Sequence, residues 1–511
     1  MLHTVLIVSV CGIALSWLIE ALCIRPKSLF FWQRCWPANL VHISNWCLCF
    51  SLLLTITARP WFSLSIICCA QFFMLLVNQA KYHSLREPFL AQDFEYFSDA
   101  IKHPRLYLPF FGVWRIILAV VAVSIAIILG LTFEASMLDS VNSQIFILNI
   151  SWLMLASAGL LFFAVKKLPH ISLNPEQDQH ALGQFAFLYS YFSLLCKPTV
   201  IDAELQMTTT LKSNTPVASL PHVVAVQSES FFDPRACYST VNPSILQHFD
   251  RACQQSMQFG NLDVPAWGAN TVRTEAAFLT GLSPKSLGIH QFNPYRLFAR
   301  QPVNSLAKVL KTAGYKTLCI HPYPVSFYLR DKVFPTLGFD SFIDVSSFTD
   351  AQKKGQYTSD QAIAEKVDQL LREADQALFI FVITMENHGP LHLETPLKDN
   401  LEEIFTEQGV KDYLNQSATL ADLNVYLRHL KNADLMVEKI TDSLQQQNRP
   451  GLLAWYGDHI PIMPKVYAKL GEPTPDTPYL IWHSKHLSLP ANNVNTQAHT
   501  LSEQILSYLK L

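Results

Sequence analysis

The feature that most constrains this chain is a series of five apolar runs in its first third. They cover residues 4–24, 39–57, 61–79, 110–133 and 145–165. A helix needs about 20 apolar residues to cross a hydrocarbon core about 30 Å thick, and each run approaches or exceeds that length. The first run lacks a basic segment before it and a small-residue cleavage site, so it predicts an anchor and not a removed signal peptide. We expect a transmembrane domain over residues 1–168; buried helices of a large soluble protein are the alternative.

Charge is unevenly distributed along the 511 residues. Only 15% of them are charged, against about 25% in an average soluble domain. Residues 1–170 carry 11 Lys and Arg against 7 Asp and Glu, and the rest of the chain carries 27 against 33. The net charge of −2 supplies no broad basic surface for phosphate backbones, so we expect no nucleic-acid partner.

Basic residues follow the first, third and fifth apolar runs, whereas the loop after the fourth run has none. By the positive-inside rule, this pattern places the C-terminal domain in the cytoplasm. Two charged residues inside the runs, Glu20 and Arg115, lie near the ends of their spans, where we expect them to reach the interface. The basic residues are Arg25, Lys27, Arg34, Lys81, Arg86, Lys102, Arg105, Lys166 and Lys167.

The rest of the chain has the pattern of an α/β domain. Residues 169–215 predict a juxtamembrane linker, with an amphipathic stretch at 184–195 that could lie along a membrane surface. From residue 216 to 511, short apolar runs typical of buried parallel strands alternate with helical patterns. The expected strands are 222–227, 316–320, 378–384, 451–456 and 479–482, and the expected helices lie near 302–313, 361–373, 419–446 and 500–510.

Chemically reactive side chains follow four of these strands. Glu229 comes after the first strand, His321 after the second, His388 after the third, and Asp458-His459 after the fourth. Ligands of open α/β sheets bind outside the carboxyl ends of the strands. We therefore expect these residues to form a site at one edge of the sheet.

The side chains at this edge offer the ligands of a divalent metal. Glu229 and Asp458 supply hard oxygen atoms and His459 supplies an imidazole nitrogen, a mixture that suits Mn²⁺, Zn²⁺ or Mg²⁺. Each residue also has a structural alternative. Gly-Asp-His is equally typical of a turn with a capping Asp, Glu229 of a solvated loop, and His321 and His388 of hydrogen-bonded structural histidines.

The segment 270–281 predicts a helix that begins with a hydroxyl. Asn270 or Thr271 can cap its first turn, and Gly281 marks its end. The N–H groups at a helix N-terminus favour a phosphate, and a metal could convert the Thr271 hydroxyl into a nucleophile. A threonine that only caps the helix is the alternative.

Five motifs in order give the chain a resemblance to a known family. They are Val-Gln-Ser-Glu-Ser (226–230), Asn-Thr-Val-Arg-Thr-Glu (270–275), His-Pro-Tyr-Pro-Val-Ser-Phe-Tyr-Leu-Arg-Asp (321–331), Thr-Met-Glu-Asn-His-Gly-Pro (384–390) and Tyr-Gly-Asp-His (456–459). Together they resemble the lipoteichoic acid synthase and glucan phosphoglycerol transferase branch of the alkaline phosphatase/sulfatase superfamily. The resemblance covers roughly residues 215–485, and the preceding five spans also fit it. It implies a bundle of about five transmembrane helices followed by a sulfatase-like α/β catalytic domain at 216–511.

The resemblance also implies a role for each candidate residue. Glu229, Thr271, Asp458 and His459 would bind one divalent metal, usually manganese in this branch. Thr271 would form a covalent phosphothreonine, and His388 would protonate the leaving group or hold the phosphate. Phosphate and glycerol oxygens would be bound by His321 and Arg330, with Tyr328 or Phe327 beside the glycerol.

The expected activity is transfer of phosphoglycerol from phosphatidylglycerol to a glycan or polymer. The resemblance places this multi-pass protein in a bacterial-type inner membrane with its catalytic domain extracytoplasmic, against the charge count above. Cys-x-Pro-x-Arg, the formylglycine motif of true sulfatases, is absent from the sequence, and no second-metal carboxylates are evident. A phosphoethanolamine transferase, a phosphoester or sulfoester hydrolase, and a non-catalytic membrane binding protein are the alternatives.

Overall fold

The computed structural model divides the chain into two compact units, residues 1–199 and 200–511. It describes residues 2–97, 101, 104, 112–199, 201–202, 207, 220–485 and 491–510. Lys102, Arg105, the start of the predicted fourth span and most of residues 200–219 lie outside the described residues.

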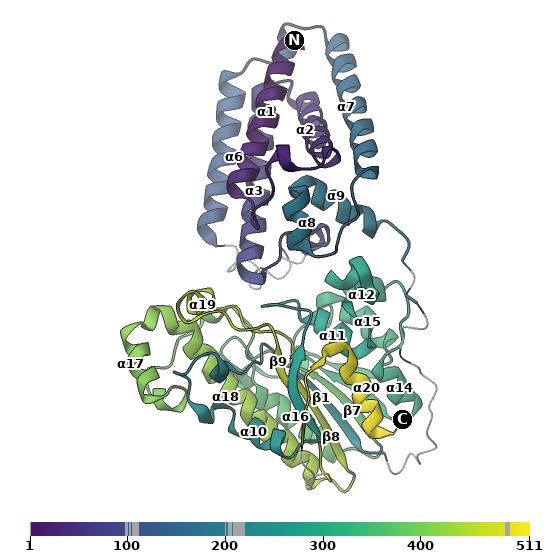
Figure 1. Cartoon of the computed structure of the whole chain (residues 1–511), viewed down its shortest axis with the longest axis vertical. Coiled ribbons are helices and arrows are strands. Elements are labelled where there is room, and N and C mark those ends of the chain that lie inside the picture. Colours follow the sequence, from purple (N-terminus) through teal and green to yellow (C-terminus); the bar gives the residue numbers. More distant parts are fainter. Residues whose placement is uncertain are drawn as a thin grey trace. The chain divides into compact units, whose positions relative to one another are not determined.

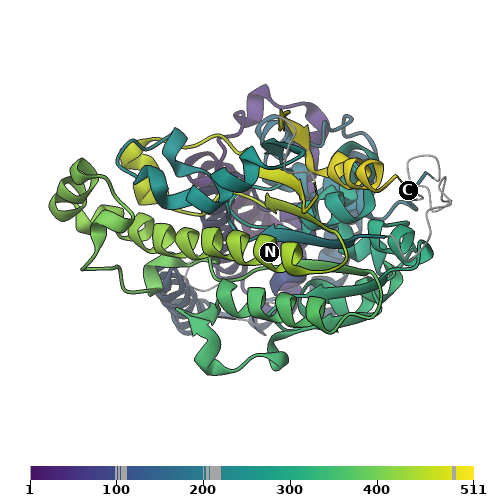
Figure 2. The same cartoon turned by 90° about the horizontal axis from the view of Figure 1, so that it is seen from below.

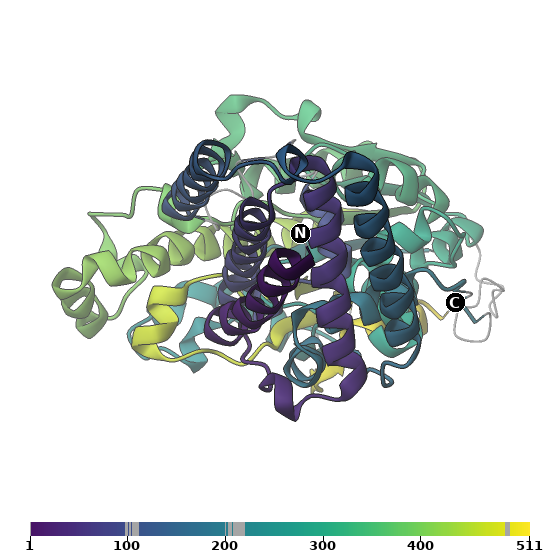
Figure 3. The same cartoon turned by 90° about the horizontal axis from the view of Figure 1, so that it is seen from above.

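In its described residues, the first unit contains five helices that are long and apolar enough to cross a membrane. α2 packs against α7, and α3 packs against α1, α2 and α6 (Figures 1 and 3). Two shorter helices follow, and the second of them, α9, packs on α2 and α7 within this unit. The seven helices are α1 (Leu2–Cys23), α2 (Trp36–Thr57), α3 (Pro60–Leu85), α6 (Val113–Phe133), α7 (Ser143–Lys166), α8 (Pro175–Leu182) and α9 (Gln184–Leu195).

Glu20, near the end of the first apolar run, is buried inside the first unit. Its side chain is fully buried and forms an ion pair with Arg34, 3.1 Å between Oε2 and Nη1. The other carboxylate oxygen accepts the backbone N–H of Gln184 at 2.7 Å, at the start of α9. A buried charge needs a partner, and Glu20 therefore joins α1, the loop before α2, and α9.

The second unit is built on one large twisted sheet, with β10-β2-β9-β8-β1-β7-β3-β4 as its strand order and β11 also paired to β2. A separate small antiparallel sheet pairs β5 (Lys353–Lys354) with β6 (Tyr357–Thr358). The five strands from β8 to β4 are parallel, whereas β9 is antiparallel to β8 and β2 is antiparallel to β9. The strands are β1 (His222–Ser228), β2 (Gln258–Asp263), β3 (Lys316–Ile320), β4 (Ser341–Ile343), β7 (Leu378–Ile383), β8 (Gly451–Gly457), β9 (Thr477–His483), β10 (Asn492–Asn493) and β11 (Thr496–Gln497).

Helices cover both faces of this sheet, which explains why its central strands are continuous apolar runs. Along β1, Val224 and Val226 pack into the core shared with α16 and α18, and Val223 and Ala225 pack into the core shared with α11, α14 and α20 (Figures 1 and 2). The helices of the unit are α10 (Gln247–Gln254), α11 (Thr271–Thr280), α12 (Pro284–Leu287), α13 (Pro294–Phe298), α14 (Leu306–Thr312), α15 (Arg330–Thr336), α16 (Asp360–Arg372), α17 (Glu407–Asn415), α18 (Ser417–Gln446), α19 (Pro464–Leu470) and α20 (Ala498–Leu509).

The predicted fold class is confirmed, with corrections in the sheet. All five predicted strands exist, but β9 runs antiparallel, so the expectation of a wholly parallel set was wrong. β2 and β4 were not predicted. β2 reads Gln-Phe-Gly-Asn-Leu-Asp and β4 has only three residues, so neither presents a continuous apolar run.

Candidate active site

The candidate residues meet because the four strands that precede them are neighbours. β8, β1, β7 and β3 are adjacent and parallel, so their carboxyl ends lie along one edge. Glu229 follows β1, His321 follows β3, His388 follows β7, and Asp458-His459 follow β8. The structure thus places these residues at the edge where open α/β sheets bind ligands.

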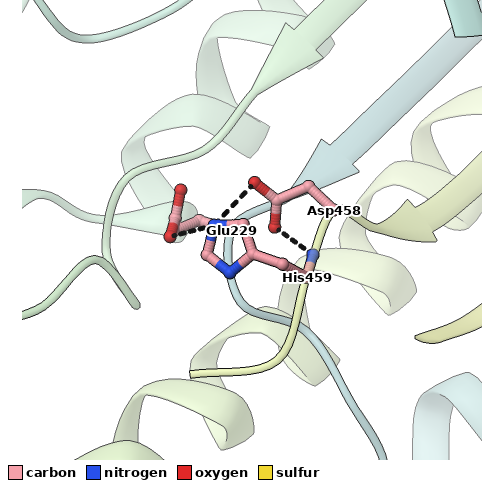
Figure 4. Close-up of side chains that lie close together, drawn as sticks. All are labelled: Glu229, Asp458 and His459. Carbon is pink, nitrogen blue, oxygen red and sulfur yellow. Dashed lines mark hydrogen bonds and ion pairs between the residues drawn. The ribbon is translucent and has the colours of Figure 1, made fainter. Parts of the chain in front are cut away.

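Glu229, Asp458 and His459 form a compact buried cluster. One ligand atom from each lies within 4.8 Å of the others. His459 Nε2 is 3.3 Å from Asp458 Oδ2 and 3.5 Å from Glu229 Oε1 (Figure 4). His459 Nδ1 is 3.0 Å from the carbonyl of Ile460. When Nδ1 donates to that carbonyl, Nε2 is the atom left to face the carboxylates.

The backbone around the cluster holds the carboxylates in place. Asp458 Oδ1 accepts the backbone N–H groups of Ser230 at 2.8 Å and of His459 at 2.9 Å. The Ser230 hydroxyl donates to Glu229 Oε1 at 2.9 Å. Ser230 has a φ of 53°, a left-handed conformation that costs a non-glycine residue energy and that occurs often at functional sites.

Thr271 brings its hydroxyl to this cluster from the first residue of α11. Its Oγ1 lies 3.5 Å from Glu229 Oε2 and 3.5 Å from His459 Nε2. The helix begins where the sequence predicted, but the capping prediction was wrong. Asn270 is the residue before the helix, with a φ of 66° and no side-chain capping bond, so a left-handed backbone conformation, and not a side-chain cap, precedes Thr271.

The donor set fits a divalent cation. Burial and the nearby Glu229 carboxylate raise the pKa of Asp458 above its usual range, and within the described residues Asp458 Oδ2 accepts no hydrogen bond. Two carboxylates this close in a buried site repel each other unless a proton or a cation lies between them. Glu229, Asp458, His459 and Thr271 together supply oxygen and nitrogen ligands of the kind that Mn²⁺, Mg²⁺ or Zn²⁺ take.

His321 and Arg330 lie close enough to interact. Burial, Arg330 and His388 keep the pKa of His321 well below its usual value, so His321 is neutral at neutral pH. Its Nδ1 is 3.2 Å from the carbonyl of Ile383 in β7. Arg330 is fully buried at the start of α15, and its Cζ is 5.4 Å from the centroid of the Tyr328 ring. Phe327 and Tyr328 have ring centroids 4.3 Å apart.

His388 is partly exposed at the end of the loop that follows β7. Its Nδ1 is 2.6 Å from the carbonyl of Gly389 and 3.4 Å from the hydroxyl of Tyr357. With Nδ1 donating to Gly389, the opposite ring nitrogen is left to act on a ligand. Among the described residues, Glu229 and His459 lie within hydrogen-bond distance of the Thr271 hydroxyl, whereas His388 does not.

Three residues near this site were missed by the sequence reasoning. Thr274 and Glu275 lie on α11 beside Thr271 and make buried hydrogen bonds to Asp458 and Arg330. Thr384, at the end of β7, accepts the backbone N–H of Glu229 at 2.9 Å. A weak signal existed for Glu275, since it lies four residues after Thr271 and therefore on the same side of a helix. Thr274, three residues after Thr271, carried the same weak signal, whereas for Thr384 helix spacing offers none.

Fold and site together define a membrane-anchored α/β protein with a candidate metal centre at the carboxyl edge of its sheet. More specifically, the chain belongs to the sulfatase family of the alkaline phosphatase superfamily, because the family model described as Sulfatase matches residues 221–511. The predicted family is thus confirmed.

Two curated relatives are similar to this chain in sequence, and one solved structure is similar to it in fold. It is 28% identical over 431 residues to the capsular polysaccharide biosynthesis protein RkpI of Rhizobium meliloti, covering 80% of this chain and 75% of the relative. It is 27% identical over 305 residues to a putative cyclic beta-1,2-glucan modification protein of the same organism, covering 56% and 45%. The integral membrane protein lipooligosaccharide phosphoethanolamine transferase A (EptA) from Neisseria meningitidis shares the fold, with a TM-score of 0.57 at 14% identity over 98% of this chain and 95% of that one.

Proposed function

We propose that this protein is a membrane-anchored phosphotransferase that moves phosphoglycerol from phosphatidylglycerol to a glycan or polymer through a phosphothreonine at Thr271. The observation that carries the proposal is the position of the Thr271 hydroxyl, 3.5 Å from both Glu229 and His459 at the start of a helix. Such a hydroxyl can be activated by a metal, and helix N–H groups favour the phosphoryl group that it would attack.

A divalent cation, Mn²⁺ in our proposal, would be held by Glu229, Thr271, Asp458 and His459, would favour the alkoxide form of Thr271 and would neutralise phosphoryl charge. In the first half-reaction, Thr271 Oγ1 forms a bond to the donor phosphorus. The bond from phosphorus to the diacylglycerol oxygen breaks, and that oxygen keeps the electron pair and takes a proton from His388. Diacylglycerol leaves, and phosphoglycerol remains on Thr271.

In the second half-reaction, a hydroxyl of the acceptor attacks the same phosphorus. Its proton passes to His388, which restores the histidine to its starting state. The bond from phosphorus to Thr271 Oγ1 breaks, and Thr271 returns to the alkoxide. Throughout, the N–H groups of Arg330 would bind phosphate or glycerol oxygens, and neutral His321, whose Nδ1 faces the Ile383 carbonyl, would accept a glycerol hydroxyl at Nε2.

The names of two relatives support a glycan as the acceptor. One is a capsular polysaccharide biosynthesis protein and the other a putative glucan modification protein. The five apolar helices support a lipid donor, since they keep the chain in the membrane where the donor resides. Phosphoglycerol as the transferred group rests on the five motifs described above.

The proposal is tested with full-length protein in detergent, Mn²⁺ and phospholipids labelled in the acyl chains. We expect diacylglycerol release from phosphatidylglycerol, its loss in Thr271→Ala, and partial retention in Thr271→Ser, which keeps the hydroxyl. Thr280→Val on the same helix is the control variant. Turnover unchanged in Thr271→Ala contradicts the mechanism, release from phosphatidylethanolamine alone contradicts the donor, and release that never labels an added glycan indicates a hydrolase.

A further inference from the structure

Glu275 and Arg330, one of the candidate substrate residues, form a buried ion pair. Arg330 Nε donates to Glu275 Oε1 at 3.0 Å, and Nη2 donates to Oε2 at 2.7 Å. The side chain of Arg330 is 1% exposed and that of Glu275 is 0% exposed. Glu275 Oε1 also accepts the hydroxyl of Tyr295 at 2.5 Å. Both oxygens of the carboxylate are therefore engaged, and the fork-to-fork contact fixes the plane of the guanidinium.

One amino group of this guanidinium has nothing to bind. Arg330 Nη1 is buried and has no hydrogen-bond partner among the residues that the structure describes. An unpaired buried donor is unfavourable, and buried donors are nearly always satisfied in folded proteins. Burial is the main cause of the low pKa of His321, and the positive charge of Arg330 lowers this pKa further. The Tyr328 ring centroid lies 5.4 Å from Arg330 Cζ, and Glu275, which holds the guanidinium, lies on the helix that begins at Thr271, so the missing acceptor is expected from a ligand.

The backbone that leads to Arg330 is strained. Tyr328 and Leu329 have φ values of 56° and 60°, two consecutive non-glycine residues in the left-handed region. Such conformations persist only where surrounding contacts enforce them. Tyr328 and Leu329 pack against the core shared with α11, α14 and α20, and Arg330, directly after them, is held by Glu275.

Glu275 also links Arg330 to the candidate nucleophile. Residues four apart lie on the same face of a helix, and Glu275 is four residues after Thr271 on α11. One rigid helix therefore carries the hydroxyl that would attack phosphorus and the carboxylate that orients the guanidinium. Any tilt or shift of α11 moves both together.

We infer that Glu275 is a positioning residue, which holds Arg330 so that its Nη1 donates to a substrate oxygen at a fixed place relative to Thr271. The inference rests on the proposed function. The Glu275–Arg330 pair is neutral as a whole, so Nη1 acts as a directional donor and not as an unbalanced positive charge. Its ligand is an oxygen acceptor, either a headgroup hydroxyl or a phosphoryl oxygen.

The test compares Glu275→Gln, Arg330→Met and the double variant in full-length protein, with KM and kcat for phosphatidylglycerol and the melting temperature as readouts. We expect Glu275→Gln to raise KM about tenfold or more. In the Arg330→Met background it should add less than about twofold, since residues that act through one another are not additive. Asp250→Asn, which removes the partner of Arg235 on another surface, is the matched control and should leave both constants unchanged.

A second lipid, phosphatidylpropanol, lacks the headgroup hydroxyls and therefore shows whether Nη1 binds a hydroxyl or a phosphoryl oxygen. If Glu275→Gln raises KM only for phosphatidylglycerol, Nη1 binds a hydroxyl; if it raises KM for both lipids, Nη1 binds a phosphoryl oxygen. If Glu275→Gln does not fold, Glu275→Asp, which keeps the negative charge, takes its place in the comparison of single and double variants.

Two results overturn the inference while the proposed function stands. The first is wild-type KM and kcat in a folded Glu275 variant. The second is an effect of the Glu275 variant that is equally large with and without Arg330. If the wild-type protein turns over no phospholipid, the proposed function fails and the inference fails with it.

Discussion

The hydroxyl of Thr274 donates a hydrogen bond to the backbone carbonyl of Asp458, with 2.8 Å between the two oxygens. Both residues are fully buried. Thr274 lies on α11, three residues after Thr271, and Asp458 directly follows β8. This single bond therefore connects the helix of the candidate nucleophile with the strand end of two candidate metal ligands.

Replacing Thr274 with Val should lower both stability and activity. Valine keeps the shape but leaves the Asp458 carbonyl buried and unpaired, which costs about 1–3 kcal/mol. A small shift of the nucleophile can reduce a rate by about 10²-fold, so diacylglycerol release should fall by at least tenfold. Thr274→Ser should keep both properties. Wild-type release by Thr274→Val in a lipid assay would show that this bond does not position the site.

Removing the metal should lower the melting temperature of the protein. A cation bound only by the folded state, at 100 times its dissociation constant, adds about 2.7 kcal/mol. A chelator should therefore reduce the melting temperature, and Mn²⁺ should restore it. Asp458→Asn should abolish this response, whereas Glu407→Gln on an exposed helix should keep it. Equal responses of the two variants to chelation and Mn²⁺ would place the metal elsewhere.

His429 should make the stability of the catalytic unit depend on pH. Its ring nitrogens are 2.9 Å from Glu386 and 3.0 Å from Glu394. Burial alone would lower the pKa of His429, but the two carboxylates outweigh burial and raise it. Because the pKa of His429 is higher in the folded state, its protonated form stabilises the fold at pH values below its unfolded-state pKa of about 6.5. This stabilisation is lost as the pH rises through the folded-state pKa.

Melting curves of the wild type and His429→Gln check this sign. The difference in melting temperature should be larger at pH 6 than at pH 9. A difference that is the same at both pH values, or larger at pH 9, would mean that His429 is neutral in the folded protein. Lys411→Gln, on an exposed helix, is the control.

The left-handed backbone at Asn270 gives a prediction on stability. Its φ of 66° suits asparagine and glycine, whereas a β-branched residue pays about 1–3 kcal/mol there. Asn270→Gly should stay close to the wild type in chemical unfolding, and Asn270→Val should be destabilised by that amount. Equal loss in both variants would instead point to a role of the Asn270 side chain.

Much of the fold could be predicted from the sequence because its central strands are buried on both faces. β1, β7 and β8 are buried along their whole lengths and have continuous apolar runs at their centres, so their positions and the residues that follow them are evident from the chain alone. β2 could not be found this way. It lies toward the edge of the sheet with Gly260 and Asn261 in its middle, and it becomes a strand through pairing with β9 and not through its own composition.

The candidate site, like the fold, could be predicted from the sequence only in part. Glu229 and Asp458 were found because parallel neighbouring strands bring their carboxyl ends together. The pair of Glu275 and Arg330 joins residues 55 positions apart on two helices, and only the packing of α11 and α15 places them together. The position of Glu20 near a span end likewise did not reveal its buried partner Arg34.

Membrane orientation is the point on which the charge pattern and the proposed function disagree. We propose that the catalytic unit is extracytoplasmic, because phosphoglycerol transfer to surface glycans takes place there. Alkaline phosphatase fused to the C-terminus should then be active, and a fluorescent protein at the same place should be dark. With five spans, a fusion at residue 138 should give the opposite result. Fluorescence of the C-terminal fusion without phosphatase activity would contradict our assignment.

The most direct test of the account is mass spectrometry of the full-length protein after incubation with Mn²⁺ and phosphatidylglycerol in the absence of an acceptor. We predict a phosphoglycerol adduct on Thr271 that forms as diacylglycerol is released and disappears when an acceptor glycan is added. Thr271→Ala should show neither the adduct nor the release. Diacylglycerol release at the wild-type rate with Thr271 unmodified would contradict the central claim.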